Sequence, residues 1–414
     1  MSPRPPSSSS SRTGPALLAF MVGALLALSG FALGVVTDRA LRPAPTSAQD
    51  SVPPELREEF AEFWRAYGLL QRDYYYRPLD EQKMTYAAIK GFVGATGDDY
   101  TTFRTPDESR MYSDARNRNF VGLGVYTEIT PDGIRLTGII RDSPAAEAGL
   151  QPDDVIVAVD GSPVGKDLKA EDVRTLLRGP EGSTVALVVR RVGGTDTRDV
   201  SATRRRVSEP AVTLTVLPDN TAHLVVTAFN DNARVQLNDA FRRIRDEKMR
   251  GVILDLRDNG GGYVNEARLL LGQFLPKDTV AMLDDRRPTG GKLTPINVES
   301  GTDAPLDIPL VILVNGGTAS ASEIVAGAVQ DYGRGELIGT KTYGKGSQQV
   351  VTPFKNGASL QITVANWYTP KERMVQKQGI QPDVTVEQPG AVTRRVGADP
   401  QLDRGLSVLR AKIG

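Results

Sequence analysis

Two segments of the chain share one design: a continuous apolar strand, then a glycine-rich loop, then a helix. The first joins the strand 252–256 to the loop 257–262, and the second joins the strand 309–314 to the loop 315–318. From about 206 to 390 the pattern alternates buried strands of this kind with helices. In these sheets, functional sites gather where strands end and helices begin. Both loops also aim backbone N–H groups at one region, which suits a developing oxyanion, although tight turns need glycine anyway.

The composition limits the chemistry that such a site can perform. The 414 residues include no cysteine and one histidine, so thiol nucleophiles, disulfides, Cys/His zinc sites and the two-histidine metalloprotease helix are excluded. Basic and acidic residues number 50 each, so nothing indicates nucleic-acid binding. The one histidine, His223, lies in a strand far from any orienting acidic motif, and we expect no catalytic role for it.

A serine and a lysine remain as candidates for nucleophile and base. Ser320 and Ser322 stand at the start of the second helix, where capping alone would explain one serine but not the whole setting. Lys345 would need its pKa lowered by about 3 units, on the order of 4 kcal/mol, to act near neutrality, and burial can lower it that far. If a strand starts at Lys345, alternation places Ser347 and Gln349 on the same face, and Gln349 would then hold the lysine amine.

The N-terminal part predicts export. Residues 14–37 form an uncharged run of 24, which as a helix reaches about 36 Å and can cross a hydrocarbon core of about 30 Å. We expect a transmembrane signal anchor here, after a disordered tail (1–13) and before a linker (38–54). The alternative is a cleaved signal peptide with its small-residue site at 46–48. Either way, we expect the catalytic part in the cell envelope, on the periplasmic or extracellular side.

The region 55–116 is predicted to be helical and to precede the first strands. Apolar residues recur at spacings of three and four in its first helix, and a second helical stretch runs near 83–93. At the other end of the chain, we assign 391–414 to a C-terminal tail.

The segment 117–205 resembles a PDZ domain of the circularly permuted bacterial type. Four short motifs occur in order, at 143–145, 148–150, 153–156 and 159–161. The resemblance implies that a peptide C-terminus adds as a strand beside one segment, while its side chains meet an apolar pocket. The implied peptide-binding residues are Leu123, Gly124 and Val125 on the strand, with Val173 and Leu177 flanking the pocket. The alternative is a β-rich spacer that binds nothing.

Across about residues 55–388 the chain resembles the carboxyl-terminal processing peptidases, also called tail-specific proteases. The motifs that carry the resemblance lie at 254–262, 318–334, 341–347, 367–370 and 379–383. It implies a mixed α/β fold: a crotonase/ClpP-like peptidase core at 206–390, an inserted PDZ domain, the N-terminal helical region and a single N-terminal transmembrane helix.

The resemblance also implies a Ser/Lys dyad. In this family the nucleophile precedes the lysine by 25 residues, which selects Ser320 as nucleophile and Lys345 as general base, with Gln349 as its orienter. The oxyanion would be held by the N–H of Ala321 and by that of Gly261, although the choice among the three glycines at 260–262 stays open. The implied reaction is acyl transfer by a serine endopeptidase, with no metal or cofactor.

The implied partners are proteins with accessible apolar C-termini, which the PDZ domain would select while also gating the dyad. The membrane is a partner through the N-terminal helix, and nucleic acid is not. A homo-oligomer or an activating partner is left open. One alternative function is a non-catalytic PDZ adaptor on a dead protease scaffold, against which the intact Ser/Lys/Gln set argues. Another is an acyl-CoA enzyme of the crotonase type, which an export signal and a peptide-binding insert do not fit.

Overall fold

The computed structural model describes residues 57–165, 168–191, 194–286, 292–299, 306–390, 392, 394 and 396–413. The chain divides into two compact units, residues 1–84 and 85–414. The predicted tail, signal anchor and linker at 1–54 lie outside the described residues. Among the helices that are described, none has the length and apolar character needed to cross a bilayer.

The predicted N-terminal helices are present as α2 (Arg57–Asp73) and α3 (Glu81–Gly94), followed by α4 (Pro106–Arg116). The expectation that this region precedes the first strands is wrong. A short strand, β1 (Thr102–Arg104), pairs antiparallel with β18 (Ser359–Tyr368) from the far end of the chain. Three residues carry too little periodicity to predict a strand, and only its distant partner stabilises it.

The central sheet has six strands, and two of them are those predicted from the repeated design. Every residue of β12 (Gly251–Asp255) and β15 (Leu310–Val314) is buried. Neighbouring strands from β11 to β19 run parallel, and only the edge strand β10 is antiparallel. The full order is β10 (Val212–Leu217), β11 (Thr221–Val226), β12, β15, β16 (Glu336–Gly339) and β19 (Val384–Thr385), with a 3-10 turn, η2 (Pro218–Asn220), between the first two.

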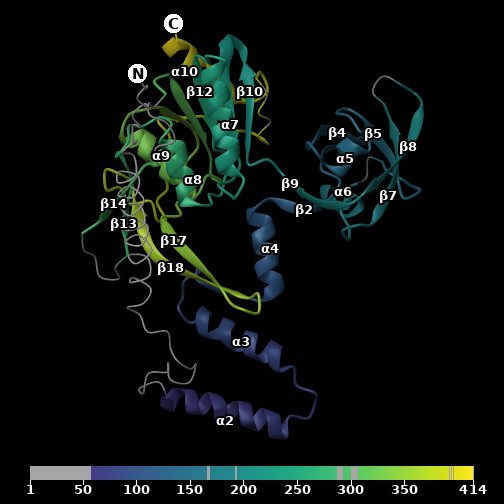
Figure 1. Ribbon diagram of the computed structural model, residues 1–414, viewed down its shortest axis with the longest axis vertical. Coiled ribbons are helices and arrows are strands. Elements are labelled where there is room, and N and C mark those ends of the chain that lie inside the picture. Colours follow the sequence, from purple (N-terminus) through teal and green to yellow (C-terminus); the bar gives the residue numbers. More distant parts are fainter. Residues whose placement is uncertain are drawn as a thin grey trace, which may run out of the picture. The chain divides into compact units, whose positions relative to one another are not determined.

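Helices cover both faces of this sheet. Leu254 and Ile312 pack into one apolar cluster with α7 (Ala233–Asp246), α8 (Val264–Leu271) and α9 (Ala321–Asp331), which lie beside the strands in Figure 1. The alternate residues Ile253 and Val311 pack against Leu406 on the other face. Leu406 belongs to α10 (Pro400–Ile413), so the segment assigned to a C-terminal tail contains a helix that completes the core.

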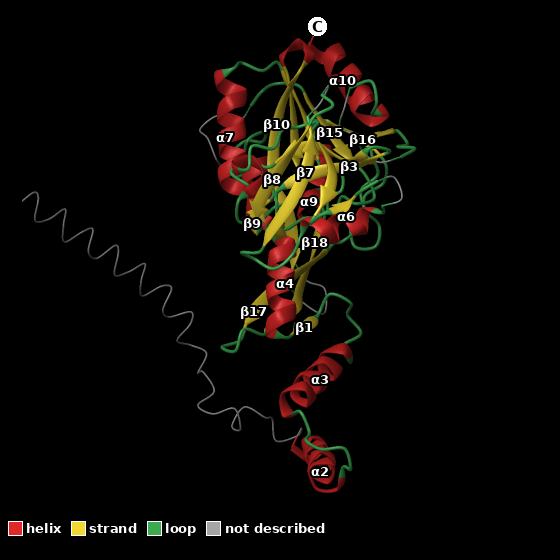
Figure 2. Ribbon diagram, turned by 90° about the vertical axis from the view of Figure 1, so that its right-hand side faces the viewer, coloured by secondary structure: helices red, strands yellow, loops and turns green. Residues whose placement is uncertain are grey.

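A second sheet carries a long hairpin. Its order is β1, β18, β13 (Val280–Asp285) and β14 (Thr294–Asn297), with β17 (Ser347–Pro353) paired along β18. The helix α4 lies beside this hairpin in both views (Figures 1 and 2), and the hydroxyls of Ser109 and Ser359 are 2.8 Å apart. The hairpin and α4 therefore present side chains from distant parts of the sequence to one region.

The predicted PDZ-like segment contains its own sheet and apolar core. The residues predicted on the peptide-binding strand, Leu123, Gly124 and Val125, do not lie on one strand, because β2 ends at Gly122 and β3 begins at Val125. Gly124 between them has a φ of +79°, and a Cβ there would lie 2.4 Å from Ser143 Cβ. The elements are β3 (Val125–Thr130), β4 (Gly133–Ile139), β5 (Val155–Val159), β7 (Thr184–Arg190) and β8 (Thr197–Thr203) in sheet order, β6 (Ser162–Pro163) on β5, α5 (Pro144–Glu147), α6 (Ala170–Leu177), and the pair β2 (Asn119–Gly122) with β9 (Arg205–Ser208).

Candidate active site

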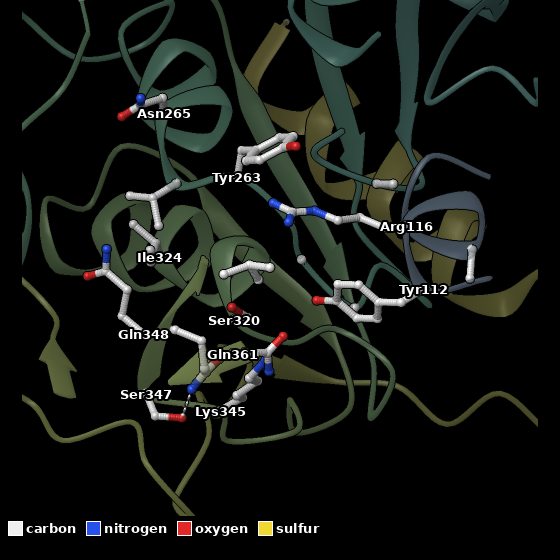
Figure 3. Close-up of a pocket in the computed structure, with 18 of the residues that line it drawn as sticks. Tyr112, Arg116, Tyr263, Asn265, Ser320, Ile324, Lys345, Ser347, Gln348 and Gln361 are labelled. Atoms are coloured by element: carbon white, nitrogen blue, oxygen red, sulfur yellow. Dashed lines mark hydrogen bonds between the residues drawn. The ribbon is translucent and has the colours of Figure 1, made fainter. Parts of the chain in front are cut away.

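One cavity of about 550 Å³ brings together four of the residues predicted for catalysis. Ser320, Lys345, Gln349 and Gly261 all line it. Figure 3 shows Ser320 and Lys345 facing the same space, with the C-terminal end of α4 on its border. The predicted oxyanion residue Ala321 is buried as the first residue of α9, directly after Ser320. The structure therefore brings these residues together at the ends of β12 and β15, and their catalytic roles stay predictions.

Ser320 has an unusual backbone. It occupies the N-cap position of α9 with φ 57° and ψ −118°, a region that residues other than glycine rarely adopt. Conformations of this kind cost on the order of 1–3 kcal/mol and persist where the surrounding structure imposes them. Ser320 borders the cavity, whereas Ser322 is fully buried and donates its hydroxyl to the Asn259 carbonyl at 3.0 Å. The two serines thus differ in access, which favours Ser320 as the reactive one.

The Glu323 carboxylate joins the serine to the lysine loop. Its Oε2 accepts the N–H of Ser320 and the N–H of Lys345, both at 2.8 Å. Its Oε1 accepts the Thr342 hydroxyl at 2.6 Å and the Gly344 N–H at 2.7 Å. Glu323 is fully buried, so these four bonds are shielded from water. The sequence placed this residue in the helix but gave no indication of its role.

Asn259 joins the two glycine-rich loops. Its carbonyl accepts the Ala319 N–H at 2.9 Å as well as the Ser322 hydroxyl. Its side chain accepts the Gly261 N–H at 2.9 Å and donates to the Val226 carbonyl at 2.9 Å. The first loop is therefore fixed against the start of α9.

Position 261 must be glycine because there is no room for a side chain, and its N–H is not free to bind an oxyanion. Its φ is +100°, and a Cβ there would lie 2.8 Å from Ser320 Cβ and 3.0 Å from the Ala321 nitrogen. Because its N–H is already donated to Asn259, Gly261 is a poor choice among the three glycines for an oxyanion donor. Within the described chain no acceptor takes up the N–H of Gly262 or of Ala321.

Lys345 is held in surroundings that favour its neutral form. Burial, and then the nearby positive charge of Arg116, lower the pKa of Lys345, while Glu323 opposes the shift. Its Nζ lies 4.9 Å from the centroid of the Tyr100 ring, a contact that the sequence did not reveal. Burial and the neighbouring phenol of Tyr343 raise the pKa of Tyr100, so Tyr100 is neutral at ordinary pH.

Gln349 lines the cavity, but its amide nitrogen has other partners. It donates to Ser347 Oγ at 2.9 Å and to Thr363 Oγ1 at 3.2 Å. The strand begins at Ser347 and not at Lys345, so the alternation argument that put both on one face was wrong for the lysine. No hydrogen bond among the described residues joins Gln349 to Lys345, and its role as orienter stays a prediction.

The single histidine is a structural residue with an unforeseen partner. His223 Nε2 lies 3.2 Å from Asp255 Oδ2 across the neighbouring strands β11 and β12, so the expectation that no acid lies near was wrong. Asp255 is in turn bound by the fully buried Arg257 at 2.7 Å, which also meets Asp399 at 2.8 Å. His223 is buried and does not line the cavity.

The PDZ-like residues predicted to bind peptide are buried, except for Val125, which is half-buried. The strand β3 lies at one end of its sheet order, so among the described strands it pairs only with β4 and its other edge is open. Leu123, Val173 and Leu177 are buried in the local core, and Val125 packs partly against it. Gly124 lies in the tight turn between β2 and β3.

The comparisons with known proteins define the class of the chain. A PDZ domain model matches residues 135–191, and the model for Peptidase family S41 matches residues 220–386. With the mixed α/β core described above, these matches make the chain a serine-type peptidase with a PDZ domain.

Individual relatives support a single family. A "Probable CtpA-like serine protease" of Staphylococcus haemolyticus is 35% identical over 338 residues, which cover 80% of this chain and 66% of that protein. One from Staphylococcus aureus strain COL is 32% identical, covering 84% of this chain and 71% of the relative. A solved putative S41 protease of Bacteroides fragilis shares the fold, with a TM-score of 0.55, 20% identity, and coverage of 82% of this chain and 91% of that one. The chain belongs to Peptidase family S41.

Proposed function

We propose that the chain is a serine endopeptidase that works through a Ser/Lys dyad. Ser320 attacks a peptide carbonyl while neutral Lys345 takes the hydroxyl proton. Lys345 then returns that proton to the leaving amine, and water releases the acyl group from Ser320. The oxyanion is held by the Ala321 N–H and by an amide of the 260–262 loop other than that of Gly261.

The observation that carries the proposal is the shared cavity of Ser320 and Lys345. Glu323 accepts the backbone N–H of both residues, so the loop that carries the base is tied to the start of the helix that carries the nucleophile. The lowered pKa of Lys345 also favours a base over a surface cation, because a lysine must be neutral to accept a proton.

Substrate choice and location belong to the same proposal. The open edge of β3 suits addition of a peptide C-terminus as an extra strand, with apolar side chains directed toward α6. The uncharged run at 14–37 would anchor the chain in the membrane with the peptidase exported, or else be cleaved as a signal peptide. The substrates would be exported proteins cut near their C-termini.

The test is cleavage of an unstructured protein with an apolar C-terminus, followed by mass spectrometry. Ser320→Ala and Lys345→Ala should each abolish cleavage. Lys341→Ala is the control for the lysine, because Lys341 is exposed on the same loop. Ser322→Ala should keep most activity, with some loss of stability, because its hydroxyl bonds the Asn259 carbonyl.

Full activity in the Lys345→Ala variant would rule out the Ser/Lys dyad mechanism. Absence of cleavage by the wild-type protein, with retained peptide binding, would instead favour the non-catalytic PDZ adaptor.

A further inference from the structure

An arginine forms part of the cavity wall without a catalytic role in the proposed mechanism. Arg116 is the last residue of α4, and its Cζ lies 3.7 Å from the centroid of the Tyr263 ring. Arg116 and Tyr263 both line the cavity that contains Ser320. Figure 3 shows the guanidinium stacked beside the ring, on the opposite side of Ser320 from Lys345.

The neighbouring arginines have acidic partners, and Arg116 does not. Arg110 pairs with Asp107 on the same helix, and Arg118 pairs with Glu209. Within the described part of the chain, no carboxylate lies within ion-pair distance of Arg116.

The acid that lines the cavity is already engaged. Asp258 Oδ1 accepts the Asn315 amide at 2.8 Å, and its Oδ2 lies 3.8 Å from Arg394. The cavity is therefore lined by Lys345 and by a guanidinium that has no ion-pair partner among the described residues.

The stacking geometry leaves the arginine able to bind a ligand. A guanidinium stacked on an aromatic ring contacts that ring through the flat face of the guanidinium group. The N–H donors of the guanidinium point outward in its own plane and stay available. Those donors match the two oxygens of a carboxylate in a bidentate pair. The Tyr263 ring thus fixes the plane of the Arg116 guanidinium, and the N–H edge of the guanidinium stays free for a ligand in the cavity.

We propose that Arg116 binds a substrate carboxylate close to the scissile peptide bond, and so selects substrates by charge at that position. The inference rests on the proposed function and names a substrate class for the same site. The carboxylate has two sources: an Asp or Glu side chain, or the free C-terminus of a substrate cut within a few residues of its end. Both present the same planar anion to the guanidinium.

The experiment compares matched peptides in kcat/KM with the wild-type enzyme. One set carries a single Asp or Asn at each of the three positions on either side of the cleaved bond. A second set has a free or an amidated C-terminus. We expect about a tenfold preference for the charged member at one position, the strength of a charge-assisted hydrogen bond. The set that shows the preference identifies the source of the carboxylate.

The variants assign the preference to Arg116. Arg116→Gln should abolish it. The comparison is made at a pH above the acid limb of both proteins, where Lys345 is neutral in each, and there kcat/KM for the neutral peptide should stay within a few-fold of wild type. Tyr263→Leu should weaken the preference for the charged peptide, because the Arg116 guanidinium would no longer stack on an aromatic ring. The control Arg110→Gln, on the exposed face of the same helix, should retain the full preference.

The inference is overturned if wild type shows no preference for a charged member in either set. It is also overturned if, at that same pH, Arg116→Gln lowers kcat/KM equally for charged and neutral peptides, because Arg116 would then serve the fold or catalysis. A failure of the proposed function is distinguishable, since no Ser320-dependent cleavage of any peptide would then be seen.

Discussion

Replacing the buried Glu323 by glutamine should disconnect the two halves of the site. The side chain keeps its shape but exchanges one carboxylate oxygen for an NH2 group. Each carboxylate oxygen of Glu323 accepts two hydrogen bonds in the wild-type protein. In the glutamine variant, the two donors on one side would face the new NH2 group, which is itself a donor. The less costly orientation puts the NH2 toward Thr342, whose hydroxyl can turn and accept, and leaves the Gly344 N–H without a partner.

The magnitude follows from these bonds. Hydrogen bonds to a charged group contribute about 1.5–3 kcal/mol each, so losing two of them costs about 3–6 kcal/mol. The rotatable Thr342 hydroxyl recovers part of one bond, which places the expected cost at about 3 kcal/mol. The remaining bonds also weaken, because a neutral amide oxygen is a poorer acceptor than a carboxylate. The loop that carries Lys345 should loosen, and kcat should fall by on the order of a hundredfold.

The assay is urea unfolding followed by circular dichroism, together with kcat/KM on one peptide. Glu247→Gln is the control, because Glu247 is exposed and its one ion pair among the described residues is with Arg243 four residues earlier, so its change should cost about 0.5 kcal/mol or less. A Glu323→Gln variant that loses less than about 1 kcal/mol and keeps wild-type kcat would refute the role given to this carboxylate.

Three further outcomes follow from the site. Because Lys345 must be neutral to act, activity falls as the pH drops through its pKa. Arg116→Gln removes a cation that lowers this pKa, so the acid limb of kcat/KM on a neutral peptide should move to higher pH. An acid limb that does not move would contradict the electrostatic contact between Arg116 and Lys345. Gly261→Ala should lower kcat by on the order of a hundredfold, since its Cβ would lie 2.8 Å from the nucleophile's Cβ, whereas Gly260→Ala has open space and should cost much less; equal losses would count against this geometry. Tyr100→Leu should lower kcat about tenfold while Tyr100→Phe keeps it, because both rings, but not leucine, attract the ammonium form of the lysine that each turnover creates; a phenylalanine variant as poor as leucine would oppose that reading.

The sequence predicted the parts of the site that depend on local pattern. Continuous apolar runs indicated the buried strands β12 and β15, and the glycine loops after them indicated where a site would form. Spacing taken from the family resemblance selected Ser320 and Lys345, and both line one cavity. The strands and the loops after them were predictable because strand burial and loop position are fixed by neighbours in the chain, whereas the roles of Ser320 and Lys345 stay predictions.

The contacts that tune the site could not be predicted, because they join segments that are distant in sequence. Tyr100 reaches Lys345 only because β1 pairs with β18. Arg116 reaches the cavity because α4 ends against Tyr263. The Asn259 side chain takes the N–H of Gly261, which no spacing rule reveals, and this changes which loop amide is free.

The most direct test of the mechanism is to trap the acyl-enzyme. Wild-type protein and the Lys345→Ala variant would be mixed with an activated ester of a substrate peptide, quenched in acid within seconds, digested and mapped by mass spectrometry. The proposed mechanism predicts an acyl group on Ser320 of the wild-type protein and almost none on the Lys345→Ala variant. Acylation at Ser322 or elsewhere, or equal labelling of Ser320 in both proteins, would contradict it.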